Sequence, residues 1–368
     1  MSFLSKLFGG GKAPETIETY ADFWAWFVEH EAEFHSIVRS KDASKIENDF
    51  FGPLGSKLRQ IKDGIFFLVG MLDDETVDMI FTADGIPKNI AFVEELVDAA
   101  PGISGWEFKS SKPATSGFVT EMGGVKLDEN SLSFYPNDDE DKPDLVNVTL
   151  VHEAFDGPSA QQAKQGAFMF LDSYLGEINF MANVDDLEFR PPAEAEKDLI
   201  PIEALPNYLE TRQALFVEKY HGVRIFTEND AYSMLEGTTA KGLPSIATVN
   251  TDLMKWDKKA SHPWMFVVTI PYKGIVNGMP DADTGSKMYE LEHAFEDELK
   301  DVDGYLNIGR QTRDNARHIF FACVDFRLPS KVAHRLQLKY ISSLSFEYEI
   351  FKDKYWRAVS HFQPSESV

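Results

Sequence analysis

The chain has 368 residues, of which 43% are hydrophobic and 13% aromatic, so it can bury sizeable cores and is not globally disordered. This length is long for a single core and predicts two or three domains. The formal net charge of −24 argues against general binding to nucleic acids or anionic membranes, because their phosphate groups would be repelled.

The cysteine content and the N-terminal sequence predict a cytoplasmic protein. The single cysteine, Cys323, cannot form an internal disulfide, which fits a reducing compartment. The stretch 1–8 is too short for a secretory signal and runs into three glycines instead of a cleavage site. No apolar run approaches the ~20 residues that a membrane span needs. We expect a frayed tail over 1–15, with a weak contact to a membrane or a partner as the alternative.

An N-terminal α+β domain is expected over residues 16–190. Its first part opens with two helices, after which the hydrophobic period changes to that of strands. The expected elements are helices at 22–39 and 44–61, a hairpin of 65–72 with 77–82, a helix at 90–100 and a strand starting at Gly105.

A second series of the same kind follows in this domain. Its expected elements are strands near 131–135 and 145–152, a helix at 160–175 and a strand at 176–184. Two successive strand-strand-helix-strand units therefore fill the domain, which predicts a tandem, pseudo-repeated architecture.

Acidic residues are concentrated in the middle of the chain. Between Glu121 and Glu210 there are 20 acidic and 5 basic residues, a net charge of −15. The run 137–142 within this stretch is expected to be a solvated loop. The prolines of 191–207 predict a linker, and 208–260 is expected to be a connecting segment that begins with a short helix.

The residues 261–368 predict a ferredoxin-like βαββαβ domain, so the fold class is α+β. The expected elements are a strand at 263–270, a helix at 287–300, strands at 305–310 and 317–324, a helix at 330–341 and a strand at 346–351. The first and third of these strands are apolar on both faces. Because the two helices of this fold cover only one face of the sheet, we expect the other face to be covered too. The N-terminal domain, the preceding segment and a second copy of the chain are the three candidate covers.

Motifs that carry catalytic chemistry are incomplete in this chain. His30 and His35 are five residues apart, whereas two zinc ligands on one helix face need a spacing of four. The acidic run 137–142 lacks the glycine and the glutamate of a calcium loop. Cys323 lies in an apolar strand, where burial disfavours its thiolate. We expect no catalytic residue, no metal and no cofactor.

One group of residues stands out as a candidate binding surface in this acidic chain. Between Arg310 and Lys339 there are 7 basic and 2 acidic residues. Four of the basic residues recur every four positions along the second ferredoxin helix, which puts them on one stripe. The candidate binding residues are Arg310, Arg313, Arg317, Arg327, Lys331, Arg335 and Lys339.

Three interpretations of this basic surface remain open. It is either a solvated face balanced by the acidic domain, a surface for a protein partner, or an RNA-binding surface. The RNA signal is weak, because 317–322 lacks the glycine of the RNA-recognition motif and has Ile319 at its first stacking position. The loop around Gly278-Met279-Pro280 is either a recognition loop or a connector to the next helix.

Several short motifs in the last third resemble a bacterial family known as domain of unknown function 695. The motifs are Leu243-Pro244, Ala247-Thr248-Val249-Asn250, Pro263-Trp264, Tyr272, Gly278-Met279-Pro280, Tyr305, Gly309-Arg310 and Phe346-Glu347-Tyr348-Glu349. The family is similar in fold to the bacterial inhibitors of ribonuclease E, which are small acidic ferredoxin-like regulators that bind protein. The resemblance implies no catalytic residue.

We therefore expect a cytoplasmic, non-catalytic protein-binding or regulatory module. Its partner would be a basic protein such as a nuclease or a toxin, or a second copy that associates through the apolar sheet face. The alternative is a small-molecule-binding or hydrolytic protein with a site between domains, in which Arg310, Arg313 or His318 grips an anion.

Overall fold

The computed structural model describes residues 16–223, 226–275 and 277–363, so the expected tail over 1–15 lies outside the described residues. The chain divides into two compact units, each built from two stretches of sequence. Unit 1 contains the stretches up to residue 129 and from 158 to 181, and unit 2 contains 130–157 and the residues from 182 onwards. Among the described residues, no helix is long and apolar enough to cross a membrane.

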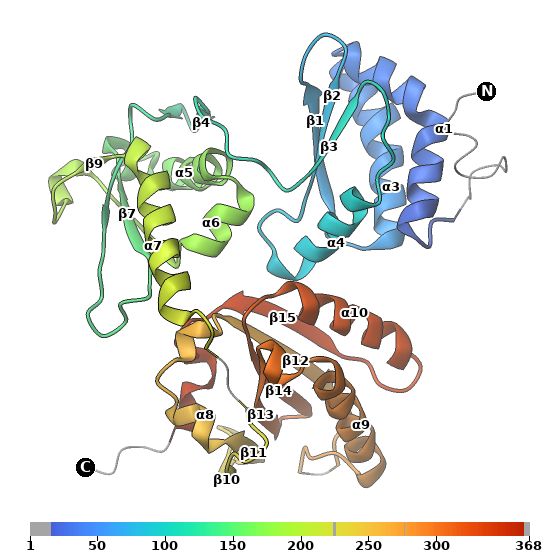
Figure 1. Ribbon diagram of the computed structural model, residues 1–368, viewed down its shortest axis with the longest axis vertical. Helices are drawn as coiled ribbons and strands as arrows, with labels where there is room; N and C mark the ends of the chain where they lie inside the picture. Colours follow the sequence, from blue (N-terminus) through green and yellow to red (C-terminus); the bar gives the residue numbers. More distant parts are fainter. Residues whose placement is uncertain (1–15, 224–225, 276, 364–368) are drawn as a thin grey trace. The chain divides into compact units, whose positions relative to one another are not determined.

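Unit 1 begins with helix α1 (Tyr20–Arg39), whose start is fixed by reciprocal hydrogen bonds between Thr19 and Asp22. Its buried aromatic face packs on the strands that follow, with Trp24 and Phe108 rings 4.6 Å apart. The other elements are α2 (Ala43–Lys45), a π-helical turn (Ile46–Phe51), α3 (Gly52–Ile61), β1 (Phe66–Met71), β2 (Val77–Thr82), α4 (Pro87–Asp98), β3 (Trp106–Ser110), β4 (Thr120–Met122), β5 (Val125–Leu127) and α5 (Ala160–Leu175) (Figure 1).

The predicted internal repeat is present in the strand topology. In the first copy, β1 pairs antiparallel with β2, and β3 returns after α4 to pair parallel with β2. In the second copy, β6 (Ser133–Pro136) pairs antiparallel with β7 (Asn147–Val151), and β8 (Asp186–Arg190) returns after α5 to pair parallel with β7. The strand pairing is thus the same in both series, although α5 belongs to unit 1 whereas β6, β7 and β8 belong to unit 2.

Two expectations for this region were wrong in detail. Residues 177–183 form helix α6 (Glu177–Asn183) and not a strand, and the strand comes afterwards as β8. The proline-rich stretch 191–207 is not a plain linker, because β9 (Ile200–Pro201) adds to β6 and both Ile202 and Leu205 are fully buried. The expected short helix is α7 (Leu205–Tyr220).

The C-terminal domain in unit 2 has the predicted βαββαβ order. Its core strands lie in the order β13-β14-β12-β15, and every neighbouring pair is antiparallel. The elements are β12 (Trp264–Pro271), α9 (Ala282–Glu298), β13 (Tyr305–Arg313), β14 (Ala316–Cys323), α10 (Arg327–Tyr340) and β15 (Glu347–Lys352).

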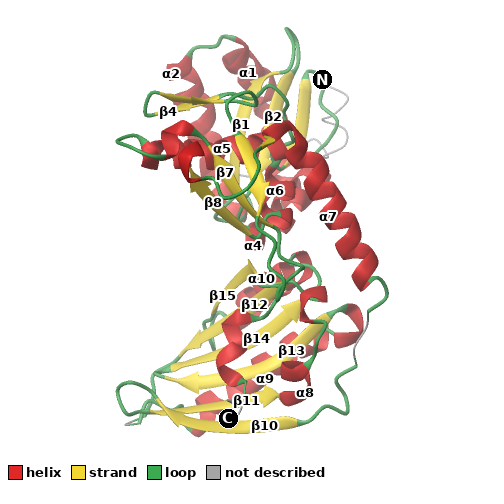
Figure 2. Ribbon diagram, turned by 90° about the vertical axis from the view of Figure 1, so that its left-hand side faces the viewer, coloured by secondary structure: helices red, strands yellow, loops and turns green. Residues whose placement is uncertain are grey.

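Two strands that the sequence analysis left in a connecting segment extend this sheet. β10 (Tyr232–Thr238) pairs with β11 (Pro244–Asn250), and β11 pairs with β13, which makes a six-stranded sheet. Figure 2 shows β10 at one edge of this sheet and β15 at the other. Helices α9 and α10 pack on one face, where the Phe266 and Phe295 rings lie 5.5 Å apart.

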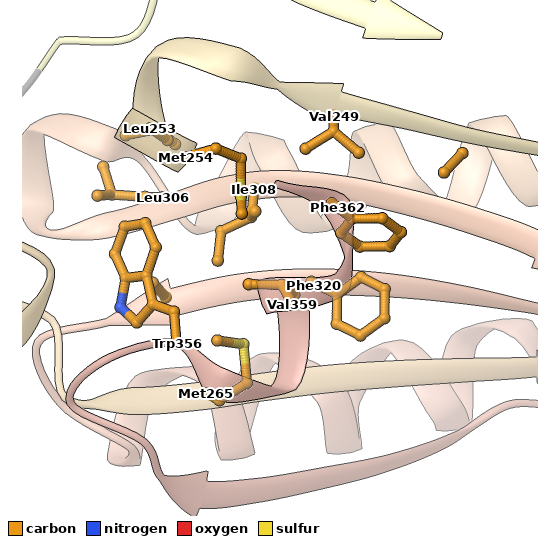
Figure 3. Close-up of a cluster of buried hydrophobic side chains, with 12 residues drawn as sticks. Val249, Leu253, Met254, Met265, Leu306, Ile308, Phe320, Trp356, Val359 and Phe362 are labelled. Carbon is orange, nitrogen blue, oxygen red and sulfur yellow. The ribbon is translucent and has the colours of Figure 1, made fainter. Parts of the chain in front are cut away.

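The second face of the sheet is covered by the chain itself over part of its area. The preceding segment contributes α8 (Thr251–Lys255), as one of the three candidate covers predicted, and a C-terminal 3-10 helix (Arg357–Phe362) contributes the rest (Figure 3). The buried residues of this cluster are Ala247, Val249, Leu253, Met254, Met265, Leu306, Ile308, Phe320, Ala322, Trp356, Val359 and Phe362. Association of two copies through this face stays a prediction.

Candidate functional site

Two arginines of the sheet meet a tyrosine and a glutamate of α9. Arg310 pairs in register with Ile319, and Arg317 with Thr312, which turns both arginines toward the helices. The ring centroid of Tyr289 lies 4.7 Å from the guanidinium carbon of each arginine. We refer to Arg310, Arg317, Tyr289 and Glu292 as the guanidinium cluster.

Glu292 compensates one of the two positive charges. Its Oε1 accepts a hydrogen bond from Arg310 Nη1 at 3.0 Å, and its side chain is buried. Burial raises the pKa of the Glu292 carboxyl, and Arg310 opposes this shift. One turn further along α9, Glu296 accepts a hydrogen bond from Asn307 Nδ2 at 2.7 Å and pairs with His293.

Arg317 is the deeply buried member of the guanidinium cluster, with 5% of its surface exposed. Its Nε donates to Thr312 Oγ1 at 3.1 Å. Its Nη1 is buried and has no hydrogen-bond partner among the described residues. Burial lowers the pKa of Arg317 from its usual value, which reflects the cost of keeping this charge away from water. The cluster therefore holds two guanidinium groups against one carboxylate, and both the donor Arg317 Nη1 and the acceptor Glu292 Oε2 are buried without a hydrogen-bond partner among the described residues.

Arg313 and His318 lie on the opposite face of the sheet from Arg310. The register pairs Arg313 with Ala316 and Gln311 with His318, one position out of phase with Arg310 and Arg317. Burial and the charge of Arg313 lower the pKa of His318, whose Nδ1 is 3.1 Å from Thr269 Oγ1. The structure thus does not bring Arg310, Arg313 and His318 together as one anion grip.

The basic stripe of α10 forms as the spacing predicts, opposite the buried residues Val332 and Leu336. Part of its charge is compensated within the domain. Arg327 pairs with Asp325 at 2.8 Å, and Arg335 pairs with Glu298 of α9. Lys331 and Lys339 complete the stripe, with Lys339 Nζ 5.3 Å from the ring centroid of Tyr340. Such exposed pairs contribute little to stability, and binding of a partner by this stripe stays a prediction.

The loop after β12 is held down on the β13–β14 hairpin. Asn315, in the hairpin turn, accepts from Gly274 N at 3.2 Å through its side chain and donates its backbone N–H to Gly278 O. Tyr272 also donates its hydroxyl to Gly278 O at 3.0 Å. The described residues of this segment are therefore tied to the hairpin turn before α9 begins, and its role as a recognition loop or a connector stays a prediction.

Sequence reasoning missed a second charged cluster, where the acidic stretch meets the end of β15. Asp144 accepts hydrogen bonds from Lys219 Nζ, Tyr220 OH and Tyr355 OH at 2.8–3.0 Å. Burial raises the pKa of Asp144, but these hydrogen bonds outweigh it and the net shift is downward. A cavity of about 500 Å³ lies beside this cluster, between the acidic loop and α7.

Asp185 anchors the same region. Its carboxylate lies 2.9 Å from Lys352 Nζ and 2.8 Å from Lys354 Nζ, and all three side chains are nearly buried. Burial lowers the pKa of Lys352 to about 8. The alternating Lys352-Asp353-Lys354 at a strand end was the one signal of this cluster in the sequence. The sequence analysis counted Asp144 and Asp185 only as part of the net negative charge of the acidic stretch.

The described residues give no sign of a metal centre or of a reactive cysteine. No group of three His, Cys, Asp or Glu side chains in 16–223, 226–275 and 277–363 is placed to hold a metal ion. Cys323 is fully buried at the end of β14, and burial raises the pKa of its thiol, which disfavours the nucleophilic thiolate.

The guanidinium cluster lies within the part of the chain that matches a known family model. Residues 237–362 match the model of a family of unknown function, DUF695. The predicted resemblance is confirmed for this third of the chain. The DUF695 segment starts inside β10 and ends with the C-terminal 3-10 helix, so it includes β11, α8 and the cover of the second sheet face as well as the ferredoxin-like core. No curated protein and no solved structure matches the chain significantly.

Proposed function

We propose that the protein is a non-catalytic protein-binding module, whose DUF695 segment takes a carboxylate of its partner at the guanidinium cluster. The observation that carries the proposal is the buried Nη1 of Arg317, which lacks a hydrogen-bond partner among the described residues. A buried donor left unpaired costs ~1–3 kcal/mol. A carboxylate would remove that cost through charge-assisted, bidentate hydrogen bonds.

The charge balance favours a carboxylate over a phosphate. Two guanidinium groups face one carboxylate, so one further negative charge makes the guanidinium cluster neutral. A phosphate group, with a charge of about −1.5 to −2, would bring an excess of negative charge next to the buried Glu292. An Asp or Glu side chain, or a chain terminus, of a partner protein has the required charge.

Access to Arg317 runs past Tyr289. The tyrosine ring lies against both guanidinium groups, yet 43% of the residue is exposed. The proposal requires that rotation of this side chain about its Cα–Cβ bond uncovers the guanidinium groups. Exposed side chains rotate on the picosecond to nanosecond scale, so this step does not slow binding.

The probe for this proposal is acetate, compared with chloride and inorganic phosphate at constant ionic strength. We expect acetate to raise the melting temperature of the full chain more than chloride or phosphate does, because a ligand that binds only the native state stabilises it. Arg317→Gln should abolish the difference between acetate and chloride. The matched control is Arg313→Gln, on the opposite face, which should retain it. An equal response to acetate in all three proteins would overturn the proposal.

A second candidate function is inhibition of a basic nuclease or toxin through the acidic stretch. The observation that favours it is the loop 137–142, where Asp138, Glu140 and Asp141 remain exposed beside the 500 Å³ cavity. If a basic protein copurifies with the tagged chain, changing these three residues to their amides should release it, whereas Arg317→Gln should not. Retention by the amide variant would reject this candidate.

A further inference from the structure

Strand β10 is an exposed edge strand of the six-stranded sheet. Among the described residues, β11 is the one strand that pairs with it, so its outer row of backbone N–H and C=O groups faces away from the sheet. All seven residues of β10 are exposed. Met234, Tyr232 and Leu235 are 66%, 50% and 37% exposed, respectively. An apolar edge of this kind is a template for strand addition.

The opposite edge of the same sheet is built differently. β15 carries Glu347, Glu349 and Lys352 within six residues, and such charges discourage pairing with another strand. β10 carries a single charge, Glu236. The charged residues of the hairpin from Tyr232 to Asn250 are Glu236 and Lys241 alone, so the hairpin is neutral in a chain of net charge −24. Two copies of this acidic chain can approach each other here without strong repulsion.

The exposed apolar side chains of β10 lie on both of its faces. Met234 pairs with Thr248, and Thr248 pairs with Arg310, so Met234 lies on the α9 side of the sheet. Leu235 pairs with Ala247 and lies on the other side. A strand that adds here therefore has to bring apolar side chains on both faces and little charge. β10 of a second copy has this pattern.

We propose that two copies of the chain pair antiparallel through β10, about a two-fold axis, to form one continuous sheet. The register that overlaps the whole strand places Leu235 opposite its counterpart in the second copy. It also places Met234 opposite Glu236, so that the two acidic side chains do not face each other. Use of the same strand by both copies makes the contact closed and self-complementary.

Sedimentation equilibrium of the full chain over micromolar concentrations tests the pairing. We expect the wild type to form dimers and no higher species. Leu235→Lys and Leu235→Glu each place like charges directly opposite each other across the dimer axis. The dimer dissociation constant of each variant should therefore be at least about tenfold higher than that of the wild type. An equimolar mixture of the two variants places opposite charges across the axis and should restore dimers.

The control is Leu338→Lys, an exposed leucine of α10 far along the chain from β10, which should leave the dimer unchanged. Circular dichroism of each variant checks that the fold is kept. A monomeric wild type overturns the proposal, even if β10 binds a strand of another protein. A wild-type dimer that persists in both Leu235 variants, or a mixture that stays monomeric, overturns it as well.

Discussion

At the scale of single residues, Gly309 decides which face of the sheet Arg310 occupies. A β-bulge between Asn307 and Gly309 inserts Ile308 as an extra residue, so the alternation of β13 shifts by one position. Leu306 and Ile308 both join the cluster on the second face, and Arg310 turns to the helix side, toward Glu292. Without the bulge, Arg310 would point away from the guanidinium cluster.

Gly309→Ala is expected to destabilise the C-terminal domain by about 2–4 kcal/mol. Gly309 has φ +144°, and an added Cβ would lie 2.2 Å from Thr248 O and 2.9 Å from Val249 Cα, both of which are backbone atoms of β11. Urea unfolding measures the change. In the control, Gly285→Ala on α9, the Cβ meets no atom within 4 Å, so stability should stay equal or rise by about 0.5–1 kcal/mol. Equal midpoints for Gly309→Ala and wild type would show that the bulge tolerates a side chain.

At the scale of elements, the C-terminal 3-10 helix acts as a lid on the doubly apolar strands. Trp356 leads into it, with its indole Nε1 donating to His262 O at 3.1 Å and its ring 6.0 Å from that of Trp256. The apolar residues on both sides of β12 and β14 predicted that the sheet face opposite α9 and α10 is covered. Only the structure assigns the cover to α8 and this terminal segment, because their few apolar residues carry no periodic signal.

Trp356→Ala should cost about 3–5 kcal/mol, since it leaves a cavity beneath the lid and removes the hydrogen bond from the indole to His262 O. Phe351→Ala is the matched control, because Phe351 lies on the same face in register with Met265 but is 39% exposed. We expect its cost to stay near 1 kcal/mol or below. Guanidinium unfolding followed by tryptophan fluorescence and circular dichroism compares the two, and similar losses would contradict the role of the lid.

At the scale of the whole molecule, each compact unit contains a carboxylate that several partners hold in place. In unit 1, Glu177 accepts hydrogen bonds from Thr82 Oγ1, Gly85 N and Lys112 N at 2.7–3.2 Å. In unit 2, Asp185 holds Lys352 and Lys354. Because a buried charge that loses its partner is costly, these residues report on the two units separately.

Asp185→Asn should lower the stability of unit 2 by about 3–5 kcal/mol, because two nearly buried ammonium groups lose their counter-charge. Glu177→Gln should destabilise unit 1 through its lost charge-assisted hydrogen bonds. Since each unit has a compact core, differential scanning calorimetry should show the two substitutions moving different transitions. A shift of all transitions together by either substitution would show that the units unfold as one.

The local sequence pattern by itself determined most of the helices and strands of this protein. The βαββαβ order, the internal repeat and the basic stripe of α10 follow from hydrophobic period and charge spacing, which are local properties. The faces of the strands and the partners of the charges were decided by tertiary structure. Helix α6 forms where an alternating pattern predicts a strand, and its first residue, Glu177, is held by groups some 65 to 95 positions away. β10, the bulge before Arg310 and the lid at Trp356 likewise depend on contacts between distant segments, which no local period encodes.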